Sequence, residues 1–380
     1  MSISGKAAIV GAAELDTWVS ECRSPVGLMA EASRRAVADA GLTLADVDGI
    51  FSASSHYTFP TMNLAQELEL HPRFMDSSNI GGASFISHLG HAAAAIEAGL
   101  CEVALIAYGS TQRSDKGKLV SRAEWSAYEE PYGLIHPISS VAMIAQRHMH
   151  EFDTTPEQLA AVAVSARQWS LLHPSPPYPT PLTVEEVLDS KVISSPLHAR
   201  DCCLVTDGGA AIVVTSAARA RDLPRPPVYL RGFSESSNHR TISAMPDLTS
   251  TVASQTSRLA LAMAGRSIGD VDTAHVYDAF TASLMILIED IGFCGKGEGG
   301  PFVADGNVAP GGSLALNTNG AGLSFTHPGM LGLFLLTEAV TQLRGDGGAR
   351  QVPDASTSLV HGMGLTIAAH STAILSTHAD

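Results

Sequence analysis

An internal repeat constrains the fold of this chain more than any other feature of its sequence. The segments RRAVADAGLTLADVD (residues 34–48) and RLALAMAGRSIGDVD (residues 258–272) are identical at eight of fifteen positions without a gap. Each reads as an amphipathic helix that ends at a glycine, Gly41 or Gly265, followed by an Asp-Val-Asp turn and a strand. This repeat predicts two similar halves, which we place at residues 1–222 and 223–380.

Both halves carry the pattern of an α/β protein. Apolar runs such as Ala104–Tyr108 and Ala210–Thr215 are typical of strands that are buried on both faces. Each half also has a Gly-rich elbow, at residues 79–85 and 319–325, that leads into an apolar helix. Hydrophobic residues make up 45% of the chain and charged residues 16%, enough for a large core. We therefore expect strands that alternate with helices.

The first half is interrupted by a stretch of different composition. Residues 111–200 combine polar helices at 139–150 and 156–171 with a Pro-rich stretch at 173–181. This change predicts an inserted loop domain. Residues 218–232, which contain the sequence DLPRPP, read as the linker into the second half.

Charge and cysteine content exclude several classes of function. The chain has 23 Lys plus Arg against 38 Asp plus Glu, a formal net charge of −15, which disfavours binding to a nucleic-acid backbone. No apolar run approaches the roughly 20 residues of a membrane-spanning helix, and no signal-peptide pattern is present. Five cysteines are too few and too scattered for a disulfide framework. We expect a cytoplasmic protein that binds neither nucleic acid nor membrane.

Common nucleotide and metal motifs are absent from the sequence. It contains no G-x-S-x-G elbow, no H-E-x-x-H pair and no phosphate-binding loop. Fifteen histidines are present, but none stands with carboxylates or thiols at the spacing of a metal site. We expect no metal.

Three Gly-rich loops in the second half present chemically active side chains. Tyr277 directly follows a strand, His327 lies in the loop NTNGAGLSFTHPG, and His361 precedes Gly362 in the turn before the last strand. Loops at strand ends of α/β sheets converge on a ligand crevice, so we expect these loops and the elbow at 79–85 to surround one pocket. Imidazole, phenol and backbone N–H groups there suit proton transfer and the stabilisation of an oxyanion.

Taken together, the motifs resemble the thiolase superfamily, specifically the sterol-carrier-protein type of thiolase often named lipid-transfer protein. The resemblance covers nearly the whole chain and rests on YDAFT from residue 277, EDIGFCGKGEGG from 289, THPG from 326 and DCCLVTDGGAA from 201. It implies a thiolase fold: two similar α/β halves in αβαβα layers, with a loop domain inserted in the first half.

The thiol groups of a thiolase are missing. In family members that act as thiolases, a Cys at the start of the buried first-half helix takes the acyl group, and the resemblance places that position at Gly82. The second Cys, the usual acid/base, falls at Val360, and Tyr277 stands where the family has His or Asn. His327 alone is retained, so an acyl-enzyme cannot form by the family's route.

Neither Cys101 nor Cys294 can replace the missing thiol. Cys101 and Cys294 lie at no elbow, so we expect buried structural thiols. Ser84 lies near the helix start with His88 one turn on, and this pair is a candidate nucleophile and base against a plain helix cap.

By resemblance, the surviving residues form an acyl-CoA site. Related members without the cysteines resemble aldolases of steroid side-chain breakdown, in which tyrosines act as acid and base. We therefore expect retro-aldol or aldol chemistry on a 3-hydroxyacyl-CoA, with Tyr277 as the base and His327 stabilising the thioester enolate. Backbone N–H groups at the elbow and in the last Gly-rich turn are expected to form a second anion site. The expected residues are catalytic His327, Tyr277 and His361, and oxyanion- or substrate-binding Gly82, Gly362, Asn319 and Ser84.

Two other functions stay open: an acyltransferase with another nucleophile, and a non-catalytic subunit that binds acyl-CoA or lipid within a complex. None of the three needs a permanently bound cofactor, because the CoA thioester enters as substrate. The resemblance also implies a homodimer and a small OB-fold, zinc-ribbon protein partner. Five aromatic residues of the loop domain either shape an acyl tunnel or form ordinary core: Trp125, Tyr128, Tyr132, Trp169 and Tyr178.

Overall fold

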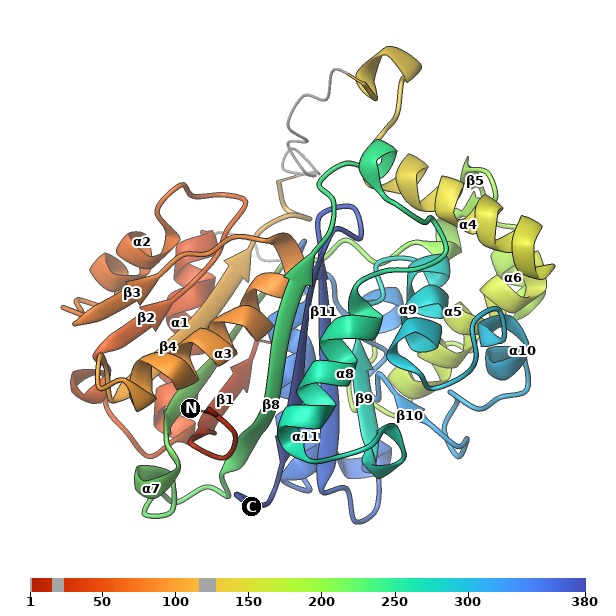
Figure 1. The fold of residues 1–380 in the computed structure, drawn as a ribbon. Helices are drawn as coiled ribbons and strands as arrows, with labels where there is room; N and C mark the ends of the chain where they lie inside the picture. The colour runs from red at the N-terminus through yellow and green to blue at the C-terminus, as the bar shows by residue number, and fades with distance from the viewer. Residues whose placement is uncertain (1, 16–23, 116–127) are drawn as a thin grey trace.

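The computed structural model describes residues 2–15, 24–115 and 128–380. Ten strands form one mixed sheet in the order β10-β9-β11-β12-β8-β1-β7-β4-β2-β3 (Figure 1). The strands are β1 (Ala7–Glu14), β2 (Gly49–Phe51), β3 (Phe74–Asp76), β4 (Val103–Ser110), β7 (Gly208–Ser216), β8 (Val228–Ser237), β9 (Thr273–Val276), β10 (Ala315–Leu316), β11 (Thr357–Gly364) and β12 (Ala369–Ser376), and β5 (Val192–Ser194) with β6 (Leu197–His198) forms a separate hairpin. The helices are α1 (Pro25–Asp39), α2 (Pro60–Glu67), α3 (Ser84–Glu97), α4 (Ile138–Phe152), α5 (Pro156–Ser170), α6 (Val184–Leu188), α7 (Ala217–Ala220), α8 (Ala253–Ala264), α9 (Thr281–Ile291), α10 (Gly299–Ala304) and α11 (Gly332–Leu343).

Helices α3 and α11 pack against each other and against strands of both halves, whereas α1 and α8 cover the opposite faces of these strands. On β4, Tyr108 packs against Phe85 of α3, whereas the neighbouring Gly109 faces α1. On β8, Phe233 faces α3, whereas Gly232 faces α8. Because successive residues of a strand point to opposite faces, α1 and α3 cover opposite faces of β4, and α3 and α8 cover opposite faces of β8. The predicted αβαβα layering is therefore confirmed.

Strand pairing connects the two halves directly. Strand β1 pairs with β8 through Ala8 with Tyr229 and Ile9 with Val228, so the strands of both halves join in a single sheet. Strands from residues 1–222 lie on one side of this junction and those from 223–380 on the other. The division into two domains at this boundary stays a prediction.

The repeated segments fold alike. Helices α1 and α8 are each followed by a glycine in the left-handed region, Gly41 at φ 69° and Gly265 at φ 64°. In each copy the first Asp of Asp-Val-Asp caps the next turn, since Asp46 accepts from the Thr43 N–H at 3.0 Å and Asp270 from the Ser267 N–H at 2.7 Å. The strands β2 and β9 then follow as predicted.

The predicted insertion covers helices from the second half. Helix α5 packs against α9, α10 and the turn at residues 321–325, and α4 packs against α9. Residues 116–127 of the predicted loop domain lie outside the described residues. Among the described residues no helix is both long and apolar enough to span a bilayer.

This topology brings chain segments from both halves to one place. The carboxyl ends of β4, β9 and β11 meet the amino ends of the two inner helices, α3 and α11. Loops at the carboxyl ends of strands are where α/β sheets bind ligands.

Candidate active site

A cavity of about 680 Å³ opens where these segments meet. Three of the predicted site residues line it, namely Gly82, Tyr277 and His327. Its wall comes from the two halves and from the insertion, and also includes Ser55, Asn79, Gln112, Glu129, His136, Arg240, Phe280, Met330, Met363 and the turn at residues 365–367.

Tyr277 and His327 form a hydrogen-bonded pair in this cavity. The Tyr277 hydroxyl lies 3.0 Å from His327 Nε2, and the two rings meet edge to face at 88°. Burial lowers the pKa of His327 to about 4 and raises the pKa of the Tyr277 phenol well above its usual value. Both groups are therefore neutral at pH 7, with the phenol donating to the imidazole nitrogen.

The amino end of α11 faces the same phenol oxygen. The Leu331 N–H, at the N-cap of this helix, donates to Tyr277 Oη at 3.4 Å. A helix amino end favours negative charge, so this contact stabilises the phenolate form when the proton leaves. The arrangement offsets part of the cost of burying that charge.

His327 is held by bonds from three parts of the chain. Its backbone N–H donates to Thr206 Oγ1 at 3.1 Å, and the Tyr108 hydroxyl donates to the Pro328 carbonyl at 2.5 Å. The Asp278 carboxyl accepts from the N–H groups of Gly322 and Leu323, at 2.7 and 3.0 Å, in the turn before His327. The imidazole is thus positioned from β4, from the segment before β7 and from the residue that follows Tyr277.

The ring of Tyr277 fills the space beside Gly82. A Cβ atom at residue 82 would lie 2.1 Å from Tyr277 Cε2 and 2.7 Å from the Met363 carbonyl oxygen. No side chain fits there while Tyr277 keeps its position. The resemblance assigns the thiolase nucleophile to residue 82. Glycine is needed there because the Tyr277 ring occupies the space that a side chain would take.

The Ser84–His88 pair does not form. Ser84 Oγ donates to the Gly81 carbonyl at 2.7 Å and accepts from the Ile80 N–H at 2.9 Å, whereas His88 Nε2 contacts the Ser78 carbonyl. Ser84 is fully buried and caps the elbow, so it lies outside the cavity lining. Cys101 is buried as expected, whereas Cys294 is only half-buried, and burial raises the pKa of Cys101 to about 11 and that of Cys294 to about 12. Neither thiol lines the cavity.

His361 and Gly362 also lie outside the cavity lining. His361 is fully buried between β11 and β12, with Nδ1 2.8 Å from Thr372 Oγ1 and Nε2 3.1 Å from His370 Nδ1. Gly362 packs behind the elbow, where a Cβ would lie 2.9 Å from Ala83 Cα. Sequence reasoning located both residues near the pocket but could not show that their strand places them behind its wall.

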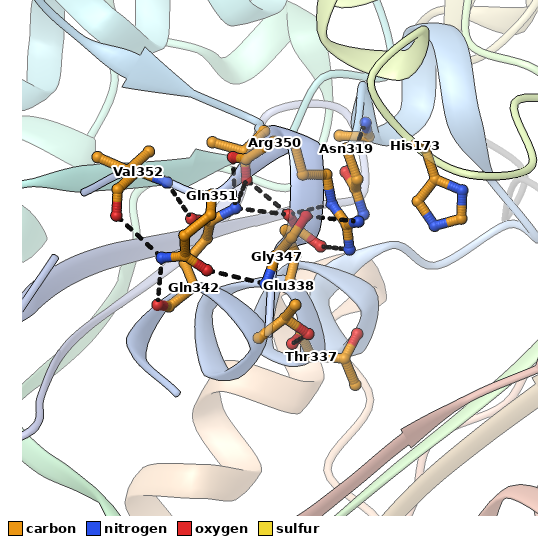
Figure 2. A network of polar contacts seen from close by, with 12 residues as sticks. His173, Asn319, Thr337, Glu338, Gln342, Gly347, Arg350, Gln351 and Val352 are labelled. Carbon is orange, nitrogen blue, oxygen red and sulfur yellow. Dashed lines mark hydrogen bonds and ion pairs between the residues drawn. The ribbon is translucent and has the colours of Figure 1, made fainter. Parts of the chain in front are cut away.

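Asn319 belongs to a second, smaller cavity of about 130 Å³. Its Oδ1 accepts from the Ala321 N–H at 2.9 Å, which holds the turn that leads to His327. Figure 2 shows Asn319 beside a buried network in which Arg350 donates to both carboxylate oxygens of Glu338, at 2.9 and 3.0 Å. Gln342 completes the network through Thr318 and residues 350–352.

The aromatic residues of the insertion divide between core and surface. Trp169 is buried and donates to the Val308 carbonyl at 2.8 Å, and Tyr178 stacks on Arg167 at 4.9 Å. Tyr128 and Tyr132 are exposed, and Trp125 lies outside the described residues. None of the four described side chains lines the cavity.

Sequence reasoning missed several polar residues of the wall. Gln112 follows the buried strand β4 at its carboxyl end, a signal that could have identified it. Glu129 and Arg240 carried no such signal. Glu129 is buried and accepts from the Ser243 N–H at 2.8 Å, a contact between distant segments, and its other carboxylate oxygen lies 3.0 Å from His136 Nε2.

The sequence and the fold are similar to those of known proteins. The family model described as Thiolase C-terminal domain-like matches residues 234–377. A 17-hydroxy-3-oxo-4-pregnene-20-carboxyl-CoA lyase of Mycobacterium tuberculosis is 37% identical over 90% of this chain and 92% of its own length. The chain belongs to the sterol-carrier-protein type of the thiolase superfamily.

Two further similarities lie in the same part of this thiolase family. A steroid side-chain-cleaving aldolase of Thermomonospora curvata is 34% identical over 90% of this chain and 91% of its own length. The solved structure of an Ltp2-ChsH2(DUF35) aldolase superposes with a TM-score of 0.90 at 32% identity, over 98% of both chains. This member of the thiolase family is an enzyme whose relatives act on CoA-linked substrates.

Proposed function

We propose that this protein cleaves a 3-hydroxyacyl-CoA by a retro-aldol reaction, without an acyl-enzyme. The observation that carries the proposal is the Tyr277–His327 pair, packed into the space beside Gly82 where a thiolase nucleophile would project. The lyase and aldolase names of the relatives support the same reaction class.

In the proposed reaction, Tyr277 and His327 take one proton from the substrate and return it. Tyr277 removes the proton of the substrate C3 hydroxyl as its own proton passes to His327 Nε2, 3.0 Å away. The C2–C3 bond breaks, C3 becomes a carbonyl, and the bonding electrons form the CoA-thioester enolate. The proton then returns through the pair to C2, which gives the shorter acyl-CoA. Because the proton is returned, the reaction needs no external acid, oxidant or bound cofactor.

A panel of acetyl-, 3-oxoacyl- and 3-hydroxyacyl-CoA esters, including steroid-like chains, tests the proposal. Products and intact protein are both followed by mass spectrometry. We expect a carbonyl product and a shorter CoA ester from the 3-hydroxyacyl-CoA, with protein of unchanged mass. An acylated protein would favour the acyltransferase alternative, and intact esters throughout would favour a non-catalytic subunit.

We further propose a homodimer that forms through strand β3, the edge of the sheet. Edge strands carry unpaired backbone groups that a second copy can pair with. Met75 on β3 is exposed, as are Phe59 and Met62 at the start of the neighbouring α2. Light scattering on the purified protein tests this arrangement, and Met75→Lys should shift the mass to that of a monomer.

We also propose that the enzyme works with a small partner of the DUF35 type, an OB-fold, zinc-ribbon protein. The similar Ltp2-ChsH2(DUF35) aldolase supports this pairing. Co-expression and co-purification with a DUF35 protein test the proposal, and separate elution of the two proteins would contradict it.

A further inference from the structure

A hairpin turn in an unfavourable backbone conformation forms part of the cavity wall. Leu365, Thr366 and Ile367, between β11 and β12, are three consecutive residues that line the cavity. Leu365 has φ 59° and Ile367 has φ 55°, in the left-handed region. A β-branched residue rarely adopts that conformation, because its side chain crowds the backbone. The surrounding structure must therefore hold the turn in place.

Two histidines hold the carbonyl groups of this turn. His370 Nε2 donates to the Ile367 carbonyl at 3.0 Å, and His239 Nε2 donates to the Thr366 carbonyl at 3.2 Å. The turn is closed by the Ala368 N–H, which donates to the Gly364 carbonyl at 3.1 Å. The hydrogen bonds from His370 and His239 therefore hold this part of the cavity wall in its shape.

His361 in turn holds the ring of His370 in place. His361 Nε2 lies 3.1 Å from His370 Nδ1, and both rings are fully buried. Burial lowers the pKa of His370 to about 4 and that of His361 well below its usual value, so both are neutral. Because His370 Nε2 carries the hydrogen that the Ile367 carbonyl accepts, its Nδ1 accepts from the Nε2–H of His361.

The turn also presses against the elbow that carries Gly82. A Cβ on Gly364 would lie 1.6 Å from the Ile80 carbonyl oxygen, so the two backbones are in direct contact. The wall is therefore fixed relative to Tyr277, whose ring packs on Gly82. Leu365 is 44% exposed and Ile367 1% exposed, so the turn extends from the surface to the interior.

We infer that His361 and His370 are positioning residues that hold the turn Leu365–Ile367 as the wall that selects the acyl group of the substrate. This inference rests on the proposed function, since it assigns the cavity to an acyl-CoA. Leu365 and Ile367 are apolar, so the wall fits an acyl group with a bulky apolar body. His361, expected to be catalytic, acts through His370 and the turn.

Selectivity is the readout that separates positioning from a merely structural role. We compare kcat/KM for a bulky, steroid-like 3-hydroxyacyl-CoA with kcat/KM for 3-hydroxybutyryl-CoA. In His370→Leu we expect this ratio to fall about 10-fold or more, with kcat for the short ester within about 3-fold of wild type. His370→Gln keeps an N–H for the Ile367 carbonyl and an oxygen for His361, and should restore much of the ratio. An equal loss for both esters in His370→Leu would overturn the inference.

Leu365→Gly supplies a second test that does not depend on the fold surviving the loss of His370. Glycine adopts φ 59° without strain and Leu365 is 44% exposed, so the midpoint of unfolding should change little while the selectivity ratio falls. An unchanged ratio would contradict the inference.

If wild type cleaves none of the esters, the proposed function fails. The Kd values of acetyl-CoA and the bulky acyl-CoA, measured by calorimetry, then test the wall on their own, and a Kd ratio that His370→Leu leaves unchanged contradicts it.

Discussion

At the scale of single residues, the absence of a side chain at Gly82 leaves the space that the Tyr277 ring occupies. The Tyr277 ring lies where a side chain at residue 82 would project, and its hydroxyl reaches His327. In the proposed reaction this phenol–imidazole pair moves a proton but forms no bond to the acyl group, unlike a thiolate nucleophile.

Gly82→Ala tests this packing. The added methyl group would lie 2.1 Å from Tyr277 Cε2, so the ring must move away from His327. We expect kcat/KM to fall at least about 100-fold, since a misplacement of about 1 Å costs that much. Gly269→Ala is the matched control, because a Cβ there meets only Ser267 Oγ, at 3.8 Å. Equal activity of the two variants would contradict the arrangement.

The pH dependence of catalysis follows from the neutral imidazole. His327 must accept a proton, and burial lowers its pKa to about 4. The rate is therefore retained as the pH falls from 8 to about 5 and is lost as His327 becomes protonated near pH 4. The profile of kcat/KM against pH measures this loss of rate on the acid side. A loss centred near pH 6.5 would show that His327 is solvated or does not act as the proton acceptor.

At the scale of elements, the site depends on how strand β4 holds the loop before α11. Tyr108, a fully buried residue of β4, donates to the Pro328 carbonyl, and its ring packs against Phe85 of α3 and Phe334 of α11. One side chain thus links the sheet, both inner helices and the loop that carries His327.

Tyr108→Phe keeps the ring and removes this bond. The Pro328 carbonyl then loses its partner in the interior, and we expect the free energy of unfolding to fall by about 1–3 kcal/mol. Denaturant unfolding measures the change. We also expect kcat to fall more than KM rises, because the imidazole loses its support. A variant with unchanged stability would mean that water replaces the hydroxyl.

The sequence predicted these elements better than it predicted the site. The repeat, the buried strands and the Gly-rich elbows identified the fold, because hydrophobic period and turn residues are local signals. Tyr277, His327 and Gly82 follow from motifs at strand and helix ends. His361 was misplaced because the face of a fully buried strand cannot be read from an apolar run. Glu129 and Arg240 could not be identified, because segments that are distant in the sequence meet at this cavity only in the folded chain.

At the scale of the whole molecule, buried histidines make the free energy of unfolding depend on pH. His88, His275, His327, His361 and His370 are buried, and burial lowers the pKa of each. Below pH 6.5 the unfolded chain binds protons at these residues. In the folded protein the pKa is about 4 for His88, His275, His327 and His370, and it is well below the usual value for His361. The free energy of unfolding therefore falls as the pH drops through this window, by about 1.4 kcal/mol per pH unit for each histidine.

His275→Leu isolates one of these residues. His275 on β9 is fully buried, and neither ring nitrogen has a hydrogen-bond partner among the described residues. An apolar side chain removes this desolvated group, so we expect stability equal to or above wild type, with the largest gain near pH 5. Thermal unfolding at pH 5 and pH 8 measures it. A loss at both values would show that His275 has a partner, such as a buried water.

The central claim is that Tyr277 and His327 cleave a C–C bond without a covalent intermediate. The most direct measurement is the rate of carbonyl product release from a 3-hydroxyacyl-CoA by wild type, Tyr277→Phe and the control Gly269→Ala, with the mass of the protein followed during turnover. We expect Tyr277→Phe to lose at least about 100-fold in kcat, as for the loss of a general base, while Gly269→Ala keeps the wild-type rate and the protein mass stays constant. Full turnover by Tyr277→Phe, or an acylated protein, would contradict the account.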